Sequence, residues 1–168
     1  VVLLHPAGLM PDAWTGVVRA LPADWKPWLP NLGAGSPAQQ RVVVEQYLDR
    51  QELRKVVLVG QGTGALVAAG VAKEQPHRVS HVVLSGLPRM EEAHVKAAKL
   101  LPKFLLRRRG VDKGQLLDSL AEARDLDVAG IAAPTLLLDD VNPLADPDRF
   151  VGEIAVFLAE HPPEGNQT

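Results

Sequence analysis

The chain has 168 residues, which fits one domain, and its hydrophobic share of 46% and charged share of 23% are those of an ordinary globular protein. It contains no cysteine, which excludes a disulfide scaffold, a cysteine nucleophile and cysteine-ligated zinc or iron–sulfur sites. The net charge of −2 argues against nucleic-acid binding, and no apolar stretch approaches the roughly 18 residues of a membrane span. We therefore expect a cytoplasmic protein that binds neither nucleic acid nor membrane.

Short apolar runs and amphipathic segments alternate along the chain, which is typical of an α/β layered fold with a parallel sheet. The apolar runs predict five strands, at residues 1–5, 25–29, 55–59, 79–84 and 134–138. Helical spacing of apolar residues predicts helices at 13–21, from 37 onward, at 65–73, in two pieces within 90–126, and from 147 to before 162.

Three of these segments carry a further local signal. Pro27 cannot donate a hydrogen bond to a neighbouring strand, so the 25–29 strand is expected at an edge of the sheet. The run at 55–59 is uninterrupted and rich in β-branched residues, as a central parallel strand should be. Ser36 and Gln39 have the spacing of a capping box, which predicts that a helix begins between them.

Six short motifs occur in order along the chain. They are His5-Pro6-Ala7-Gly8, Trp14, Pro30-Asn31-Leu32-Gly33-Ala34-Gly35-Ser36, Val59-Gly60-Gln61-Gly62-Thr63-Gly64, the segment 76–86, and Ala133-Pro134-Thr135-Leu136-Leu137-Leu138. In this order and spacing, the motifs resemble the α/β-hydrolase superfamily, in particular its small esterase- and thioesterase-like members. The resemblance covers nearly the whole chain and implies a nucleophile elbow at 59–64.

The resemblance, together with right-handed strand crossovers, predicts a three-layer α/β sandwich with five parallel strands in the order 2-1-3-4-5. We expect one domain over 1–163, a truncated α/β-hydrolase core with a lid-like helical insertion at about 88–130, and a loose tail at 164–168. The candidate site would lie at the carboxyl ends of the first and third strands. An open sheet edge could be covered by a second copy, which would make the protein a homo-oligomer.

The catalytic positions that the resemblance implies hold other residue types. Gly62 stands at the serine position of the family's elbow, and Asn142 is nearest to the acidic position, with Asp139 and Asp140 closer to the strand end. The strand and loop that carry the family's histidine have no counterpart here, and His161 lies at the far end of the last helix. We therefore expect a catalytically degenerate protein that keeps a binding pocket. The alternative is an active esterase- or thioesterase-like hydrolase that uses non-standard residues.

A backbone oxyanion hole can persist without a nucleophile. The resemblance assigns its donors to the N–H groups of Ala7 and Thr63, beside Gln61 and Gly62, and such donors favour a small acyl or carboxylate ligand. The alternative is that the glycines only permit close packing of helix on sheet. For His5, the histidine nearest this pocket, the resemblance implies a structural role, and the alternative is a catalytic base.

Residues 60–65 also have the pattern Gly-x-Gly-x-x-Ala between a strand and a helix, which is the dinucleotide-binding fingerprint. Leu84-Ser85 stand where the confirming acidic residue would be, so dinucleotide binding is kept as the less favoured alternative. We expect His77, His81 and His94 on the surface. No grouping of side chains has metal-ligand spacing, and we expect neither a metal nor a cofactor.

Overall fold

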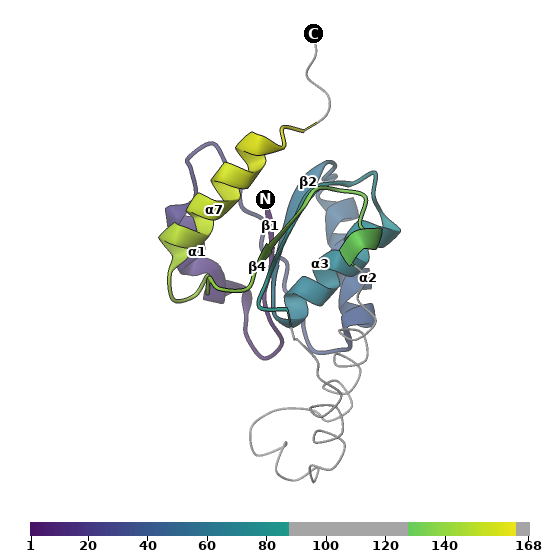
Figure 1. Ribbon diagram of the computed structural model, residues 1–168. Helices are drawn as coiled ribbons and strands as arrows, with labels where there is room; N and C mark the ends of the chain where they lie inside the picture. The colour runs from purple at the N-terminus through teal and green to yellow at the C-terminus, as the bar shows by residue number, and fades with distance from the viewer. Residues whose placement is uncertain (88–127, 164–168) are drawn as a thin grey trace, which may run out of the picture.

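The computed structural model describes residues 1–87 and 128–163 (Figure 1). The two helices predicted within 90–126, His94, most of the lid-like insertion and the tail at 164–168 lie outside these ranges.

The described residues form one parallel sheet of four strands. These are β1 (Val2–Leu4), β2 (Val56–Gln61), β3 (Val79–Ser85) and β4 (Thr135–Leu138), and they lie side by side in the order β1-β2-β3-β4. All three pairings are parallel, which confirms the α/β class. The central position of β2 agrees with its uninterrupted β-branched sequence.

The prediction of a five-stranded sheet in the order 2-1-3-4-5 is not reproduced, because the 25–29 segment forms only one isolated parallel bridge beside β1. The Trp28 N–H donates to the carbonyl of Val1 at 2.8 Å, and the Leu3 N–H donates to the carbonyl of Trp28 at 2.9 Å. Backbone groups that face a partner recur every second residue, so the next donor toward β1 would be residue 30. That residue is Pro30, which has no N–H, and the pairing ends there.

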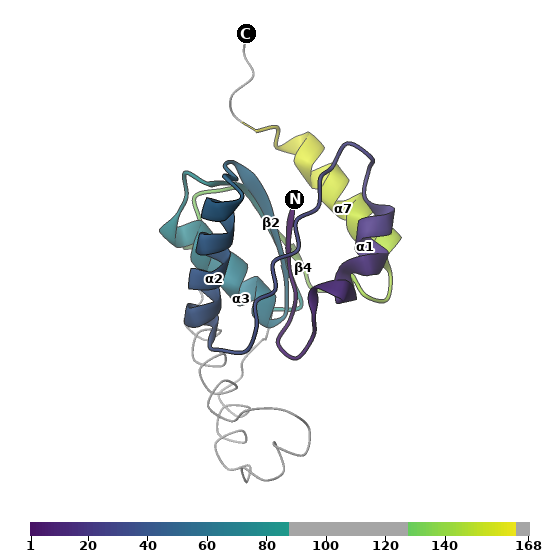
Figure 2. The same ribbon diagram turned by 180° about the vertical axis from the view of Figure 1, so that it is seen from behind.

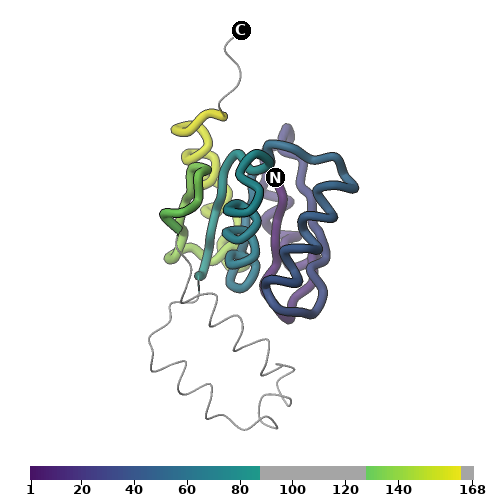
Figure 3. Tube along the Cα trace, turned by 90° about the vertical axis from the view of Figure 1, so that its right-hand side faces the viewer, coloured from purple at the N-terminus to yellow at the C-terminus, as the bar shows by residue number. Residues whose placement is uncertain are grey.

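The helices cover both faces of the sheet, as a three-layer sandwich requires. The helix η1 (Pro11–Trp14), α1 (Thr15–Ala20) and α7 (Pro147–Glu160) lie on one face, and α2 (Pro37–Arg50) and α3 (Thr63–Glu74) lie on the other (Figures 1 and 2). Figure 3 views the molecule from the side of α2 and α3. A short helix, η2 (Val128–Gly130), precedes β4. The capping box at the start of α2 is present: Ser36 Oγ accepts from the Gln39 N–H at 3.3 Å, and Gln39 Oε1 accepts from the Ser36 N–H at 2.9 Å.

Each face of the sheet has its own hydrophobic core. On one face α2 and α3 pack against β2 and β3, and eight of the twelve residues of α3 are buried, which explains why this helix has so few charges. On the other face Trp14 and Phe150, with ring centroids 6.2 Å apart, lie between α7 and the sheet. The two cores fix the ends of the strands, where loops carry the candidate site.

One polar contact joins α2 to α3 and depends on pH. Burial raises the pKa of the Glu45 carboxyl on α2, and the charge of Glu74 on α3 and a hydrogen bond between the two carboxyl groups raise it further. A hydrogen bond with Gln75 and the positive charge of Arg41 partly oppose this rise in pKa, and Arg41 Nε also lies 3.6 Å from Glu74 Oε1. Because the pKa of Glu45 is raised in the folded state, the protonated carboxyl stabilises the fold at low pH. This stabilisation is lost as the pH rises through the folded-state pKa.

Glu45→Gln is therefore expected to raise the melting temperature at pH 7 by about 1–2 °C, the size of an exposed charge effect in a domain of this length. Thermal unfolding followed by circular dichroism at pH 3 and pH 7 checks this. The gain should vanish at pH 3, where the carboxyl is protonated in both states. Glu153→Gln, on the exposed face of α7, is the matched control and should show no such pH dependence. An equal gain at both pH values would contradict the assignment.

Candidate functional site

The candidate site lies where β1, β2 and β4 end. Parallel strands present their carboxyl ends at one edge of the sheet, so the loop after β1, the turn after β2 and the loop after β4 meet there. The predicted site residues lie in these loops or, for Gln61 and Thr63, at the adjoining ends of β2 and α3.

Gly62 forms a sharp turn from β2 into α3. Its φ of 57° and ψ of −121° place it in a conformation that L side chains rarely adopt. Its N–H donates to the carbonyl of Ser85 at 2.9 Å, and its own carbonyl accepts from the Ala65 N–H at 3.1 Å. The backbone has the strained strand-to-helix elbow on which hydrolases carry a nucleophile, but no side chain projects from it.

The flanking glycines serve close packing. A Cβ on Gly60 would lie 2.3 Å from the carbonyl oxygen of Gly64, and a Cβ on Gly64 would lie 2.3 Å from the carbonyl oxygen of Leu4. Both distances are far inside van der Waals contact, so α3 can approach β1 and β2 only because these residues lack side chains. Packing thus accounts for Gly60, one of the two glycines of the dinucleotide-like motif, and for Gly64, which the motif does not require. By contrast, a Cβ on Gly62 would meet only the Pro6 Cβ, at 3.3 Å.

The structure brings together the two residues that were assigned as oxyanion donors. The Ala7 N–H donates to Thr63 Oγ1 at 2.5 Å, although the two residues are 56 positions apart. Thr63 is the first residue of α3, where backbone N–H groups have no partner within the helix. Both residues therefore line one small polar patch, but the Thr63 hydroxyl already accepts from the Ala7 N–H. No sequence motif predicted this contact between Ala7 and Thr63.

His5 contacts backbone through both ring nitrogens. It is buried, and its Nε2 accepts from the Leu32 N–H at 3.1 Å while its Nδ1 lies 3.0 Å from the carbonyl oxygen of Pro6. Because a backbone N–H can only donate, Nε2 is unprotonated and Nδ1 carries the hydrogen. Both ring nitrogens hold backbone, so His5 fastens the 30–36 turn to the end of β1 and is not placed as a base.

Asn142 organises the loop between β4 and α7. Its Oδ1 accepts from the Leu144 N–H at 3.0 Å and from Gln61 Nε2 at 3.3 Å, and its carbonyl accepts from the N–H groups of Ala145 and Asp146. Gln61 Oε1 is buried and has no hydrogen-bond partner among the described residues. Asn142 therefore links this loop to the elbow, and its partners in residues 1–87 and 128–163 include no histidine.

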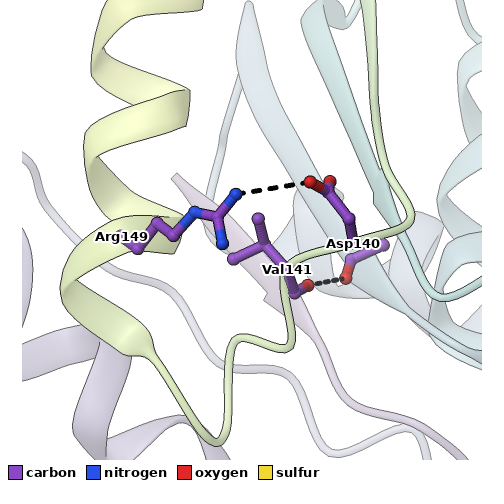
Figure 4. Close-up of polar contacts among 4 residues, drawn as sticks. Asp140, Val141 and Arg149 are labelled. Carbon is purple, nitrogen blue, oxygen red and sulfur yellow. Dashed lines mark hydrogen bonds and ion pairs between the residues drawn. The ribbon is translucent and has the colours of Figure 1, made fainter.

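The side chains of two other polar residues at this end of the sheet have partners within the fold. Asp140 forms an ion pair with Arg149 of α7 at 3.3 Å (Figure 4), and Ser85 is buried and donates to the carbonyl of Val141 at 3.1 Å. No sequence motif pointed to this role of Ser85, whose signal was a hydroxyl directly after the apolar residues 82–84 of β3.

The prediction that His81 lies on the surface is wrong. His81 is 2% exposed, and its Nε2 lies 2.5 Å from the carbonyl oxygen of His161 at the end of α7. Its ring packs edge-on against Phe157, with centroids 5.7 Å apart. A histidine in the inward-facing alternation of a strand becomes buried when a helix end supplies an acceptor. His77 is exposed, as expected.

Within the described parts of the chain, no three histidine, aspartate or glutamate side chains are grouped to hold a metal ion. None of the helices described is long and apolar enough to cross a membrane.

The parallel sheet, its helical layers and the glycine elbow after β2 define an α/β-hydrolase fold, and the chain is an α/β-hydrolase-fold protein. Solved structures share this fold. A thermophilic esterase from Thermogutta terrifontis has a TM-score of 0.66 at 16% identity, with 95% of this chain and 89% of that chain covered. A hydrolase from Pseudomonas aeruginosa has a TM-score of 0.63 at 18% identity, with 94% and 88% covered.

No protein-family model matches the chain. Among curated proteins, the pimeloyl-[acyl-carrier protein] methyl ester esterase of Aromatoleum aromaticum is 38% identical over 91 residues. The match covers 51% of this chain and 36% of the esterase, so the chain matches about a third of the length of that relative.

Proposed function

We propose that this protein binds the carbonyl or carboxylate group of an acyl ligand at the elbow after β2, and that it does not hydrolyse esters there. The observation that supports this most directly is Gly62, which keeps the strained elbow backbone without a nucleophilic side chain.

The side chains around Gly62 do not supply the chemistry of ester hydrolysis. A serine-type mechanism needs a nucleophile, a base within hydrogen-bond reach and a group that orients the base. Both nitrogens of His5 are held by backbone, and Asn142 is neutral and bonded to Gln61. Within residues 1–87 and 128–163, no histidine side chain lies in position to accept a proton at the elbow.

The backbone can still bind an oxygen atom. The Ala7 N–H contacts the side chain of Thr63, whose own N–H is the first of α3, and the helix dipole favours negative charge there. A ligand oxygen would replace the Thr63 hydroxyl as the acceptor of the Ala7 N–H. This exchange of one acceptor for another costs little, so even a weakly basic ester carbonyl could bind.

A second candidate function is ester hydrolysis on acyl esters. It is favoured by the 38% identity over 91 residues to a protein named as an esterase of the pimeloyl-[acyl-carrier protein] methyl ester. It would require a nucleophile other than residue 62. Ser85 is buried, and its carbonyl accepts from the Gly62 N–H at the elbow. Its hydroxyl already donates to the carbonyl of Val141.

Two measurements separate these functions. Hydrolysis of p-nitrophenyl acetate over pH 6–9, with labelling by a fluorophosphonate probe, should show no turnover above a heat-inactivated sample. Titration of the ¹⁵N-labelled chain with hexanoate should shift the amide signals of Ala7 and Thr63 saturably, whereas 1-hexanol should not. Turnover by the unmodified chain, or hexanoate shifts that avoid both amides, would refute the proposal.

Thr63→Val tests the role of the hydroxyl. Valine has nearly the same shape but no acceptor, so the Ala7 N–H becomes available to the ligand and hexanoate should bind about fivefold more tightly. The comparison is by NMR titration. Thr15→Val, whose hydroxyl donates to Asp12 on the far α1 side, is the matched control and should leave the affinity unchanged. Weaker binding by Thr63→Val would mean that the hydroxyl itself contacts the ligand.

A further inference from the structure

A cavity lies at the opposite end of the sheet from the elbow. Its volume is about 470 Å³, and it is lined by residues that precede or begin β2, β3 and β4 and by the end of α7. The six residues of β2 separate the two ends by about 20 Å. The cavity is therefore a separate site, and no step of the proposed function uses it.

One side of the cavity carries the positive charge of Lys55. Lys55 lines it, is exposed, and forms no ion pair with any residue in 1–87 or 128–163. Its φ of 57° is rare for a residue with a side chain, and such positions are found in turns and at ligand-binding sites. The only charged or titratable groups among the described lining residues are Lys55, His81 and His161, so no carboxylate opposes the ammonium group there.

His161 presents a second polar edge. Its Nδ1 lies 3.1 Å from the carbonyl oxygen of Phe157, which leaves Nε2 as the ring nitrogen that a ligand can reach. Its position is fixed from both sides, because its ring packs 4.9 Å from that of Phe157 and its carbonyl bonds to the buried His81. The end of α7 is thus a rigid wall of the cavity.

The remaining wall is mostly apolar. Apart from Ser80 and His81, it consists of alanine, valine and proline side chains, and the prolines are Pro76, Pro134, Pro162 and Pro163. Proline rings have no rotatable side-chain bonds, so a ligand that packs on them loses little side-chain entropy from the protein. Flat apolar groups suit such a wall.

We propose that this cavity binds a small organic anion with a flat apolar body, such as an aryl carboxylate. The carboxylate pairs with the Lys55 ammonium, and the ring lies on the proline and alanine wall. A polar head with an apolar body matches the two sides of the cavity, whereas an inorganic anion would leave the apolar wall unused.

The test is an NMR titration of the ¹⁵N-labelled chain with 2-naphthoate. For a ligand of this size we expect a dissociation constant of about 1 mM, with saturable shifts at the amides of Lys55, Val79 and Ala133 and none at Ala7 or Thr63. The neutral isostere 2-naphthamide and inorganic phosphate should each bind about fivefold more weakly or not at all. Because these amides differ from those that report hexanoate, failure at one site leaves the other proposal intact.

Lys55→Met should weaken naphthoate binding about fivefold, because methionine keeps much of the apolar stem and removes the charge. Lys26→Met removes the same charge from a lysine held over the Trp28 ring, outside the cavity, and should leave the affinity unchanged. Equal affinity for naphthoate and naphthamide, phosphate binding as tight as naphthoate, an unaffected Lys55→Met variant, or no saturable shift at the cavity amides would each overturn the proposal.

Discussion

Gly64→Ala is expected to lower the melting temperature by about 10 °C or to prevent folding. The added Cβ would lie 2.3 Å from the carbonyl oxygen of Leu4 and 2.8 Å from that of His5. Both are backbone atoms of β1 and the loop that follows it, so no side chain can rotate away and α3 must move off the sheet. Overpacking of this kind costs about 3 kcal/mol or more, and each kcal/mol is about 2–4 °C in a domain of this length.

Two further Gly→Ala variants make the comparison specific. Gly62→Ala adds a Cβ whose only neighbour is Pro6 Cβ at 3.3 Å, so it should cost only the positive-φ penalty of about 1 kcal/mol, or about 3 °C. Gly152→Ala on α7 adds a Cβ with nothing within 4 Å and should stabilise the helix slightly. Thermal unfolding measures the three melting temperatures, which should rise in the order Gly64→Ala, Gly62→Ala and Gly152→Ala. A Gly64→Ala variant within 3 °C of the unmodified chain would mean that α3 does not pack on β1 this closely.

The main features of the fold could be predicted from local pattern because each depends on few residues. The β-branched run at 55–59 forms the core of the inner strand β2, and Ser36 with Gln39 caps α2 as their spacing required. The edge position of the 25–29 segment also followed from Pro27. The sequence did not predict that this segment would fail to form a full strand. The pairing depends on which of its residues face β1, and one of these is Pro30.

The candidate site was predictable in position but not in its hydrogen bonds. The elbow and the loop after β1 could be located from motifs. The hydrogen bond from the Ala7 N–H to the Thr63 hydroxyl joins residues 56 positions apart. The bond between His81 and the carbonyl of His161 joins residues 80 positions apart. Such contacts depend on the register of strands and on where a helix ends, which sequence periodicity fixes only to within a few residues.

Gly62→Ser restores a hydroxyl at the elbow, yet it is expected to give no turnover of p-nitrophenyl acetate between pH 6 and 9. The backbone there already has the elbow form, with φ 57° and ψ −121°, so the serine hydroxyl would project at the site. Without a base in reach the hydroxyl stays protonated and is a weak nucleophile. The ring nitrogens of His5 are both bonded to backbone, and Asn142 cannot accept a proton at neutral pH. The strain of a side chain at positive φ should lower the melting temperature by about 3 °C.

A fluorophosphonate probe gives the more sensitive readout for this variant. Its phosphoryl oxygen can accept from the N–H groups of Ala7 and Thr63, so slow labelling of Gly62→Ser is expected where the unmodified chain shows none. Gly62→Ala is the matched control, because it carries the same backbone strain without the hydroxyl and should not be labelled. Rapid ester turnover by Gly62→Ser alone would reveal a base that reaches the elbow, and the binding function proposed above would then describe an enzyme that lacks only its nucleophile.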